Sequence, residues 1–304
     1  MTGGRQAVIA ASPGRWLAAL GLVFNAFTWG VSWWPMRQLG AAGLHPLWLT
    51  GLVYSTAVLL LLVLRPAALL ELLRTPVLWV LVLAAGGTNA CFNWAVSIGD
   101  VVRVVLLFYL MPLWTVLLSR LLLGERITAR GVFRVALALA GAMVVLWPAG
   151  GSGWDALPLP RNLPDALGVA GGFFFALNNV MLRREAHRSP PARALAMFGG
   201  GAGISLGLAS WLSHTGQATL PPPLAWGWLL AVAGLTLWFL ASNLSLQYGA
   251  ARLPANTTSV IMISEVFFAS ASALALGAGT LGPRELVGAV MILGGAVLAS
   301  VQRD

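Results

Sequence analysis

The chain alternates between long apolar stretches and short connections rich in Arg, Pro and Gly. A helix that crosses a bilayer needs roughly 20 mostly apolar residues, and ten stretches meet this requirement. They are residues 16–36, 46–64, 76–98, 101–123, 127–147, 165–182, 192–212, 224–248, 254–276 and 285–301. None of them alternates as a membrane β-barrel strand would. The pattern predicts an all-α polytopic membrane protein with ten transmembrane helices.

One connection is longer than the others and divides the predicted helices into two sets of five. It covers residues 148–164 and has the Gly, Pro and Ser content of a linker. The expected organisation is a first five-helix repeat at 16–147, the linker at 148–164 and a second five-helix repeat at 165–301. The first apolar run is too long for a cleavable signal peptide, so we expect it to remain as the first helix.

Composition supports the membrane class, since 59% of the residues are hydrophobic and only 9% are charged. The net charge of +9 does not indicate nucleic-acid binding, because every basic residue is an arginine placed between apolar runs. The single Cys91 and the three histidines, His45, His187 and His214, lack the spacing of metal ligands. We therefore expect no metal and no cofactor.

The arginines also predict an orientation, because cytoplasmic loops are enriched in Lys and Arg. If the N-terminus is cytoplasmic and ten helices cross the membrane, the arginines divide fourteen to four in favour of the cytoplasm. The inner set is Arg5, Arg15, Arg65, Arg74, Arg120, Arg126, Arg130, Arg134, Arg183, Arg184, Arg188, Arg193, Arg252 and Arg303; the outer set is Arg37, Arg103, Arg161 and Arg284. This asymmetry predicts a multi-pass protein of the bacterial inner membrane with both termini in the cytoplasm.

The two halves contain a weak internal repeat. Residues 93–99 align with residues 243–249 at a shift of 150, and after a three-residue insertion the shift becomes 153, which pairs Pro112 with Glu265. Because each half has an odd number of helices, the two repeats must be inverted in the membrane. Inverted halves can exchange conformations and expose a central cavity first to one side and then to the other, which favours a transporter.

Short motifs occur in a characteristic order along the chain. They are Trp29-Gly30 in the first predicted helix, Tyr-Leu-Met-Pro at 109–112 in the fourth, and Leu-Gly-Glu at 123–125. In this order the chain resembles the ten-helix EamA-type exporters of the drug/metabolite transporter superfamily, most closely the bacterial aromatic amino acid exporters. The resemblance implies export of aromatic or other neutral amino acids by alternating access. The second half departs from the pattern, since Glu265 replaces the proline and Ala278 replaces the motif's glutamate.

Glu265 is the most informative polar residue, because it falls near the middle of the ninth predicted helix. A charge at the bilayer centre costs at least about 2.5–3.5 kcal/mol on insertion scales. The carboxyl group is therefore expected to face a cavity or another helix. It can act as the counter-charge of a substrate ammonium or as a proton carrier, or it can be a packing contact; proton coupling stays open.

Other polar and aromatic residues share faces of the predicted helices at helical spacing. The expected substrate path consists of Asn25, Trp29, Ser32, Trp33, Asn89, Asn93, Tyr109, Asn178, Asn179, Trp238, Ser242, Asn243 and Glu265. Facing stripes would enclose a central cavity in which aromatic rings stack on a small-molecule substrate. Each residue also has a structural alternative, as a link between helices or as an anchor at the membrane interface.

Two residues of the fourth predicted helix are candidates for gating. Pro112 lacks an N–H group and is expected to break or bend the helix. Glu125 lies at the cytoplasmic end of this helix, where it forms either a latch or a solvated pair with Arg126.

Several other functions stay open. Drug or cation efflux and nucleotide-sugar exchange belong to the same superfamily; nucleotide sugars would favour basic residues inside the cavity, whereas the arginines here are expected at helix ends. An embedded enzyme is disfavoured because no His-containing catalytic cluster, Ser/His/Asp arrangement or metal spacing is present. A scaffold or receptor subunit would need binding surface outside the bilayer, and the connections are short. We expect no enzyme, and transport driven by gradients.

Overall fold

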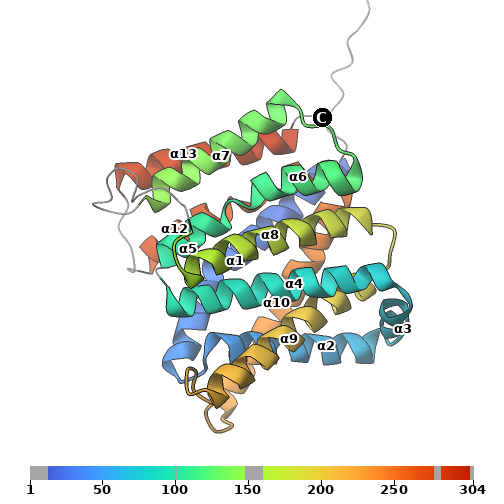
Figure 1. The fold of residues 1–304 in the computed structure, drawn as a ribbon, viewed down its shortest axis with the longest axis vertical. Helices are drawn as coiled ribbons and strands as arrows, with labels where there is room; N and C mark the ends of the chain where they lie inside the picture. The colour runs from blue at the N-terminus through green and yellow to red at the C-terminus, as the bar shows by residue number, and fades with distance from the viewer. Residues whose placement is uncertain (1–12, 100, 148–159, 277–281, 302–304) are drawn as a thin grey trace, which may run out of the picture.

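The structure is a computed structural model that describes residues 13–99, 101–147, 160–276 and 282–301. These residues form thirteen helices (Figure 1). They are α1 (Pro13–Ala41), α2 (Pro46–Leu64), α3 (Ala67–Arg74), α4 (Pro76–Ile98), α5 (Val101–Phe108), α6 (Met111–Leu123), α7 (Ala129–Leu146), α8 (Leu163–Arg184), α9 (Pro190–His214), α10 (Trp226–Arg252), α11 (Ala255–Met262), α12 (Glu265–Ala275) and α13 (Pro283–Val301). Within the described residues, seven segments are long and apolar enough to cross a membrane, one of them the pair α11–α12.

The helices follow the predicted segments, with several differences. The fourth segment is split into α5 and α6, and the ninth into α11 and α12. The short helix α3 was not predicted, because eight residues are too few for a span. Helix α1 continues five residues past its expected end at Met36, and α8 begins inside the predicted linker, where Asn162 caps it by accepting from the Asp165 N–H at 3.0 Å. Linker residues 148–159 lie outside the described residues.

Both helix breaks lie in the middle of their segments. The first falls at residues 109–110, immediately before Pro112, which is the second residue of α6 and has no N–H for the carbonyl four residues earlier. The second break falls at residues 263–264 and involves no proline. There the Ser264 hydroxyl donates to the Ile261 carbonyl at 2.6 Å. Side-chain hydrogen bonds of this kind compete with the helix ladder.

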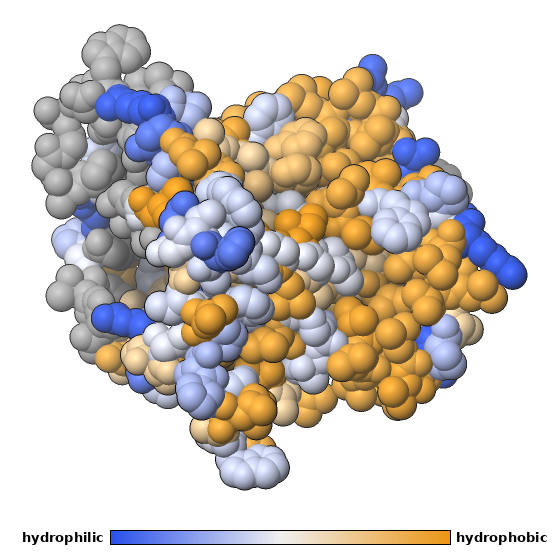
Figure 2. All heavy atoms as spheres, turned by 60° about the horizontal axis from the view of Figure 1, so that its bottom comes forward, coloured by the Kyte–Doolittle hydropathy of each residue, from blue (hydrophilic) through white to orange (hydrophobic). Residues whose placement is uncertain are grey.

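The polarity of the molecule is inverted relative to a water-soluble protein. Large apolar side chains are exposed, among them Val63 (79%), Leu121 (78%) and Leu230 (67%), whereas Asn25, Thr115 and Ser259 are buried. Figure 2 shows a broad apolar face with hydrophilic residues gathered at its edge. An apolar exterior around buried polar groups fits a lipid environment, where hydrocarbon surrounds the protein and polar groups must find partners inside.

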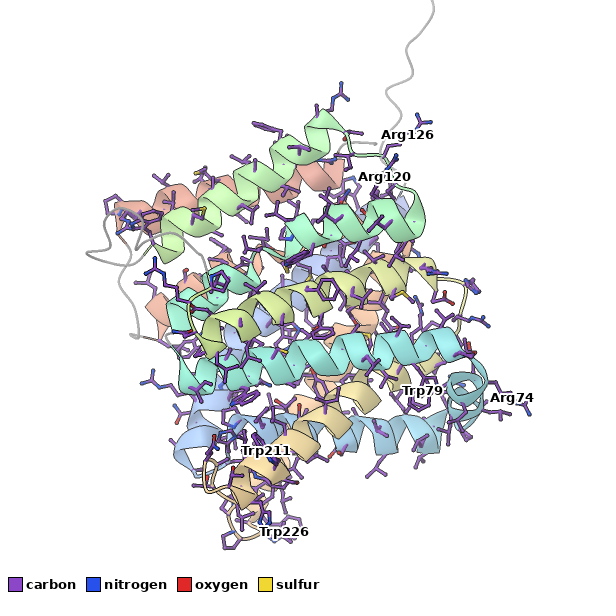
Figure 3. The ribbon with its side chains drawn as sticks, viewed as in Figure 1. Arg74, Trp79, Arg120, Arg126, Trp211 and Trp226 are labelled. Carbon is purple, nitrogen blue, oxygen red and sulfur yellow. The ribbon has the colours of Figure 1, made fainter. Side chains whose placement is uncertain are left out.

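The two ends of the helix bundle differ in charge. Arg74, Arg120 and Arg126 all lie at one end, on the right in Figure 3, with Trp79 close to Arg74. We call this the arginine-rich end; α1, α4 and α9 begin there, and α6 and α8 end there. Trp211 and Trp226 lie away from it, where α9 ends and α10 begins. We call the end at which α1 ends and α2 begins the opposite end.

The connection between α1 and α2 contains a titratable helix cap. His45 precedes α2, and its Nδ1 accepts a hydrogen bond from the Leu47 N–H at 3.3 Å. Burial lowers the pKa of His45, because desolvation disfavours the charged ring.

This cap predicts a small pH dependence of stability. A histidine whose pKa is lowered on folding stabilises the protein above its unfolded pKa of about 6.5, and the contribution is lost as the pH falls through the lower folded pKa. We expect the thermal midpoint to fall on acidification from pH 7 to pH 5. The accompanying loss in the free energy of unfolding should not exceed the contribution of an N-cap, about 1 kcal/mol. In His45→Asn, which keeps a capping acceptor but does not titrate, this part of the pH dependence should disappear. An identical pH profile in both proteins would contradict the assignment.

Candidate functional site

A central cavity of about 1140 Å³ lies among α1, α2, α4, α5, α8, α9, α10 and α12. Its lining reaches Arg37, Gly40, Ala41 and Pro46 at the opposite end of the bundle, so the cavity opens there. Toward the arginine-rich end the lining of α1 stops at Asn25, about three turns inside the helix. The cavity is large enough for an amino acid or a drug-sized molecule, since such ligands occupy pockets of about 300–1,000 Å³.

Eleven of the thirteen residues predicted for the path line this cavity. They are Asn25, Trp29, Ser32, Trp33, Asn89, Asn93, Tyr109, Asn178, Ser242, Asn243 and Glu265. They come from six helices or helix breaks that are distant in sequence, and the fold brings them around one space. Asn179 and Trp238 are not among the lining residues.

The two exceptions follow from helical register. On α10 the cavity face carries Phe239, Ser242, Asn243 and Leu246, and Trp238 lies just beyond the edge of this face, about 40° from Ser242 and about 100° from Phe239. Its indole N–H instead donates to the Thr28 hydroxyl at 2.8 Å, a contact between α10 and α1. On α8 the cavity face contains Asn178, so its neighbour Asn179 points away and is fully buried.

Hydrogen bonds join the two halves of the chain at the cavity wall. The Asn25 amide donates to the Ser242 hydroxyl at 2.6 Å, and the Trp33 indole donates to Ser272 at 2.9 Å. Within the first half, the Asn93 amide donates to the Thr50 hydroxyl at 2.9 Å. These residues therefore have a structural role in addition to facing the cavity. The buried Asn178 Oδ1, by contrast, has no hydrogen-bond partner among the described residues.

Glu265 is the first residue of α12, directly after the helix break, and it is partly exposed to the cavity. The positive end of the helix dipole favours a carboxylate at this position. Among the described residues its carboxylate has no hydrogen bond or ion pair, and Tyr109 lines the same cavity. An acidic group in an apolar, ring-lined space is suited to binding a cation.

Aromatic rings make up much of the rest of the lining. Besides the three predicted rings, the cavity wall contains Tyr54, Phe92, Phe108, Phe175, Phe198 and Phe239. Phe239 stacks on Trp29 with ring centroids 5.0 Å apart. Sequence reasoning missed these six: Tyr54 could have been noticed as a polar ring in a leucine-rich helix, but a phenylalanine that faces a cavity has the same sequence signal as one that faces lipid.

Arg37 corrects an expectation from the sequence. The predicted first helix ended at Met36, which placed Arg37 in a loop. Because α1 continues to Ala41, Arg37 lies on the helix and lines the mouth of the cavity. The cavity lining thus includes one arginine, near the end of α1, although the sequence had predicted no basic residue inside the cavity.

Polar contacts close the arginine-rich end. The half-helices α6 and α11 are joined by a 2.7 Å hydrogen bond between the hydroxyls of Thr115 and Ser259. Glu125 accepts from the N–H of Ala255 at 3.4 Å, where a carboxylate complements the N-terminus of α11.

A second carboxylate lies between the halves at this end. Glu71 of α3 accepts from the backbone N–H of Ser189 at 3.1 Å and from its hydroxyl, at the start of α9. Each half of the chain therefore supplies partners to the other where the cavity is closed.

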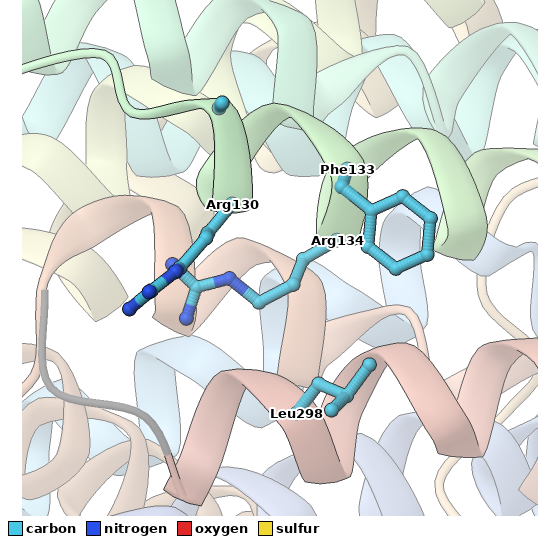
Figure 4. A pocket seen from close by; sticks show the side chains of 5 residues that line it. Arg130, Phe133, Arg134 and Leu298 are labelled. Atoms are coloured by element: carbon cyan, nitrogen blue, oxygen red, sulfur yellow. The ribbon is translucent and has the colours of Figure 1, made fainter.

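A second pocket, of about 320 Å³, lies between α7 and α13 (Figure 4). It is lined by Ala129, Arg130, Phe133, Arg134 and Leu298, and the two arginine side chains extend toward one another. It shares no lining residue with the central cavity, so it is not part of the candidate site.

The apolar helices, the apolar exterior and the central cavity are those of an integral membrane protein with a cavity for a small molecule. The sequence matches the EamA-like transporter family over residues 16–147 and 162–301, and the chain belongs to this family.

Relatives agree with this assignment. The chain is similar to the protein RarD of Salmonella typhimurium, with 33% identity over 49% of this chain and 50% of RarD. It is also similar to an uncharacterized transporter of Vibrio cholerae, with 32% identity over 41% of this chain and 44% of that protein. The matches thus span about half the length of these relatives. A solved structure described only as the crystal structure of a protein has the same fold, with a TM-score of 0.74 and 21% identity, covering 93% of this chain and 96% of the other.

Proposed function

We propose that this transporter exports neutral amino acids, aromatic ones above all, across the bacterial inner membrane. The observation that carries the proposal is the cavity itself, which combines the Glu265 carboxylate with a wall of aromatic rings. Glu265 would bind the substrate ammonium, and rings such as Trp29 and Tyr109 would contact an aromatic side chain. Amide groups of Asn178 and Asn243 supply further hydrogen-bonding groups at the wall.

We propose that the chain crosses the membrane ten times as two inverted five-helix repeats. In this arrangement the pairs α5–α6 and α11–α12 each form one broken span, and α3 lies at the membrane surface. The match to the family in two stretches supports the repeat. With the arginine-rich end in the cytoplasm, as the excess of positive charge favours, both termini are cytoplasmic and the cavity opens to the outside.

We also propose alternating access, which the two broken spans support. In this conformation α6 and α11 are hydrogen-bonded at the arginine-rich end, whereas α5 and α12 contribute to the wall of the open cavity. Opening to the cytoplasm would require the contacts of Glu125 and Glu71 to separate, while α5 and α12 approach each other. Pro112 and the Ser264 break would serve as hinges, because each interrupts the helix ladder at mid-span.

Efflux of organic cations is a second candidate function. The same carboxylate and rings that suit a substrate ammonium also suit a lipophilic cation, which aromatic faces attract. The two candidate functions differ in the substrate: an amino acid carries a carboxylate in addition to its positive charge, whereas a lipophilic cation does not.

The experiment is uptake into proteoliposomes that contain the purified protein, with and without a pH gradient. Labelled phenylalanine and tryptophan are compared with labelled tetraphenylphosphonium. Saturable uptake of the amino acids, absent from empty vesicles, supports the proposal, and its dependence on the gradient decides proton coupling. If the protein takes up tetraphenylphosphonium but neither amino acid, cation efflux is supported and amino acid export is contradicted.

A further inference from the structure

Two charged side chains line the central cavity, and they have opposite signs. Glu265 is at the start of α12, and Arg37 is in the last two turns of α1. Gly30 of α1 shows how deep Glu265 lies in the cavity. A Cβ added to Gly30 would be 2.7 Å from the Glu265 carbonyl oxygen, so the two backbones lie at the same depth. Arg37 follows Gly30 by seven residues, a rise of about 10 Å along the helix. The cavity therefore carries a negative group at depth and a positive group nearer its mouth.

Among the described residues, neither charged side chain forms a hydrogen bond or an ion pair that would stabilise the fold. In the part of the chain that the structure describes, Arg37 has no hydrogen bond or ion pair and its side chain is exposed. Two other arginines do make such contacts: Arg284 donates to the Trp147 carbonyl at 3.1 Å, and Arg183 donates to the Ala251 carbonyl at 2.6 Å. Arg37 and Glu265 do not pair with each other either, because about two helical turns separate their backbones.

A guanidinium group binds carboxylates in a bidentate geometry that an ammonium group cannot provide. The long arginine stem lets the head group lie well away from its own Cα, so the side chain can extend into the cavity from the level of Arg37. A substrate with an ammonium group at one point and a carboxylate nearby would then meet complementary charges at both levels. A substrate with only one of these charges would leave the other protein group without a partner.

We propose that Arg37 determines specificity by binding the carboxylate of a zwitterionic substrate whose ammonium group binds Glu265. This inference rests on the proposed function and narrows it, because it distinguishes amino acids from simple amines and organic cations. A positive charge at a helix end usually sets membrane topology. The inference gives Arg37 a second role, in substrate binding.

The test is competition against labelled phenylalanine, with dissociation constants measured on the purified full-length protein. The competitors are phenylalanine, phenethylamine, which lacks the carboxylate, and 3-phenylpropionate, which lacks the amine. The wild type is expected to bind phenylalanine at least about tenfold more tightly than phenethylamine, as charge-assisted hydrogen bonds provide. In Arg37→Gln this preference should disappear while phenethylamine binds as before, and Arg37→Lys should restore part of it. Arg284→Gln is the matched control at the same end of the bundle and should keep the wild-type ratio.

The outcomes separate this inference from the proposed function. If the wild type binds phenylalanine and phenethylamine equally, or if Arg37→Gln keeps the preference, Arg37 does not recognise the carboxylate and the inference is overturned while amino acid transport stands. If the wild type binds none of the three compounds, the proposed function fails and the inference fails with it. If Arg37→Gln does not fold, Arg37→Lys provides the test, because a preference that stays at the wild-type value without the bidentate guanidinium overturns the inference.

Discussion

Glu265→Gln weakens phenylalanine binding by at least about thirtyfold, the effect expected when one partner of a buried charge pair is removed at a cost of about 2 kcal/mol or more. Glutamine keeps the shape of the side chain but cannot offset an ammonium charge. The cavity wall is mostly apolar and aromatic, so no other acidic side chain among its lining residues can replace the lost carboxylate. The measurement is the dissociation constant in detergent, with initial uptake rates in proteoliposomes alongside.

Two variants control this experiment. Glu265→Asp keeps the charge on a shorter stem and should recover part of the binding. Glu185→Gln is a matched loss of a carboxylate outside the cavity, where Glu185 accepts from Arg188, and it should bind phenylalanine as the wild type does. If Glu265→Gln is well folded and its dissociation constant is unchanged, Glu265 is a packing contact and the substrate ammonium binds elsewhere.

Gly200→Leu prevents accumulation of folded protein, because α4 and α9 cross where Gly200 allows their backbones to touch. A Cβ at Gly200 would lie 2.0 Å from the Val82 carbonyl oxygen, which is backbone and cannot turn aside. Overpacking a well-packed contact costs about 1–3 kcal/mol or more, and a whole leucine at this crossing should exceed that range. The measurement is the yield of monodisperse protein and its thermal midpoint.

The same glycine-rich run provides the control. Gly203 lies one turn further along α9, and a Cβ there would meet nothing within 4 Å. Gly203→Leu should therefore fold and melt close to the wild type. Equal yields and midpoints for Gly200→Leu and Gly203→Leu would contradict the close crossing of α4 and α9.

The helical segments could be predicted from the sequence because an apolar run of about twenty residues is the length that a membrane-spanning helix requires. The break near Pro112 could also be predicted, since the chemistry of proline is local. The break before Glu265 was not predicted, because Ser264 and its neighbours include no residue that forbids a helix. The end of α1 was misplaced for a related reason: Pro35 and Arg37 are typical of a helix end, yet the helix continues to Ala41.

Prediction of the cavity was limited by register. Polar stripes placed Asn25, Asn89 and Glu265 on the correct faces, because a polar group in a membrane helix points away from lipid. Trp238 and Asn179 each lie next to a lining residue but do not line the cavity themselves. The phenylalanines of the cavity wall could not be distinguished from lipid-facing ones, since both are apolar residues in apolar helices.

If solutes cross the membrane through the central cavity, blocking the cavity at a single cysteine should stop transport. Ala273 lines the cavity two turns beyond Glu265, and replacing the only native cysteine with Cys91→Ser leaves Ala273→Cys as the sole thiol. A bulky, membrane-impermeant thiol reagent should abolish phenylalanine uptake in this variant, and phenylalanine should slow the labelling. The same reagent should have no effect on Thr215→Cys, on the exposed turn after α9. Undiminished uptake after complete labelling of Ala273→Cys would show that the transport path lies elsewhere.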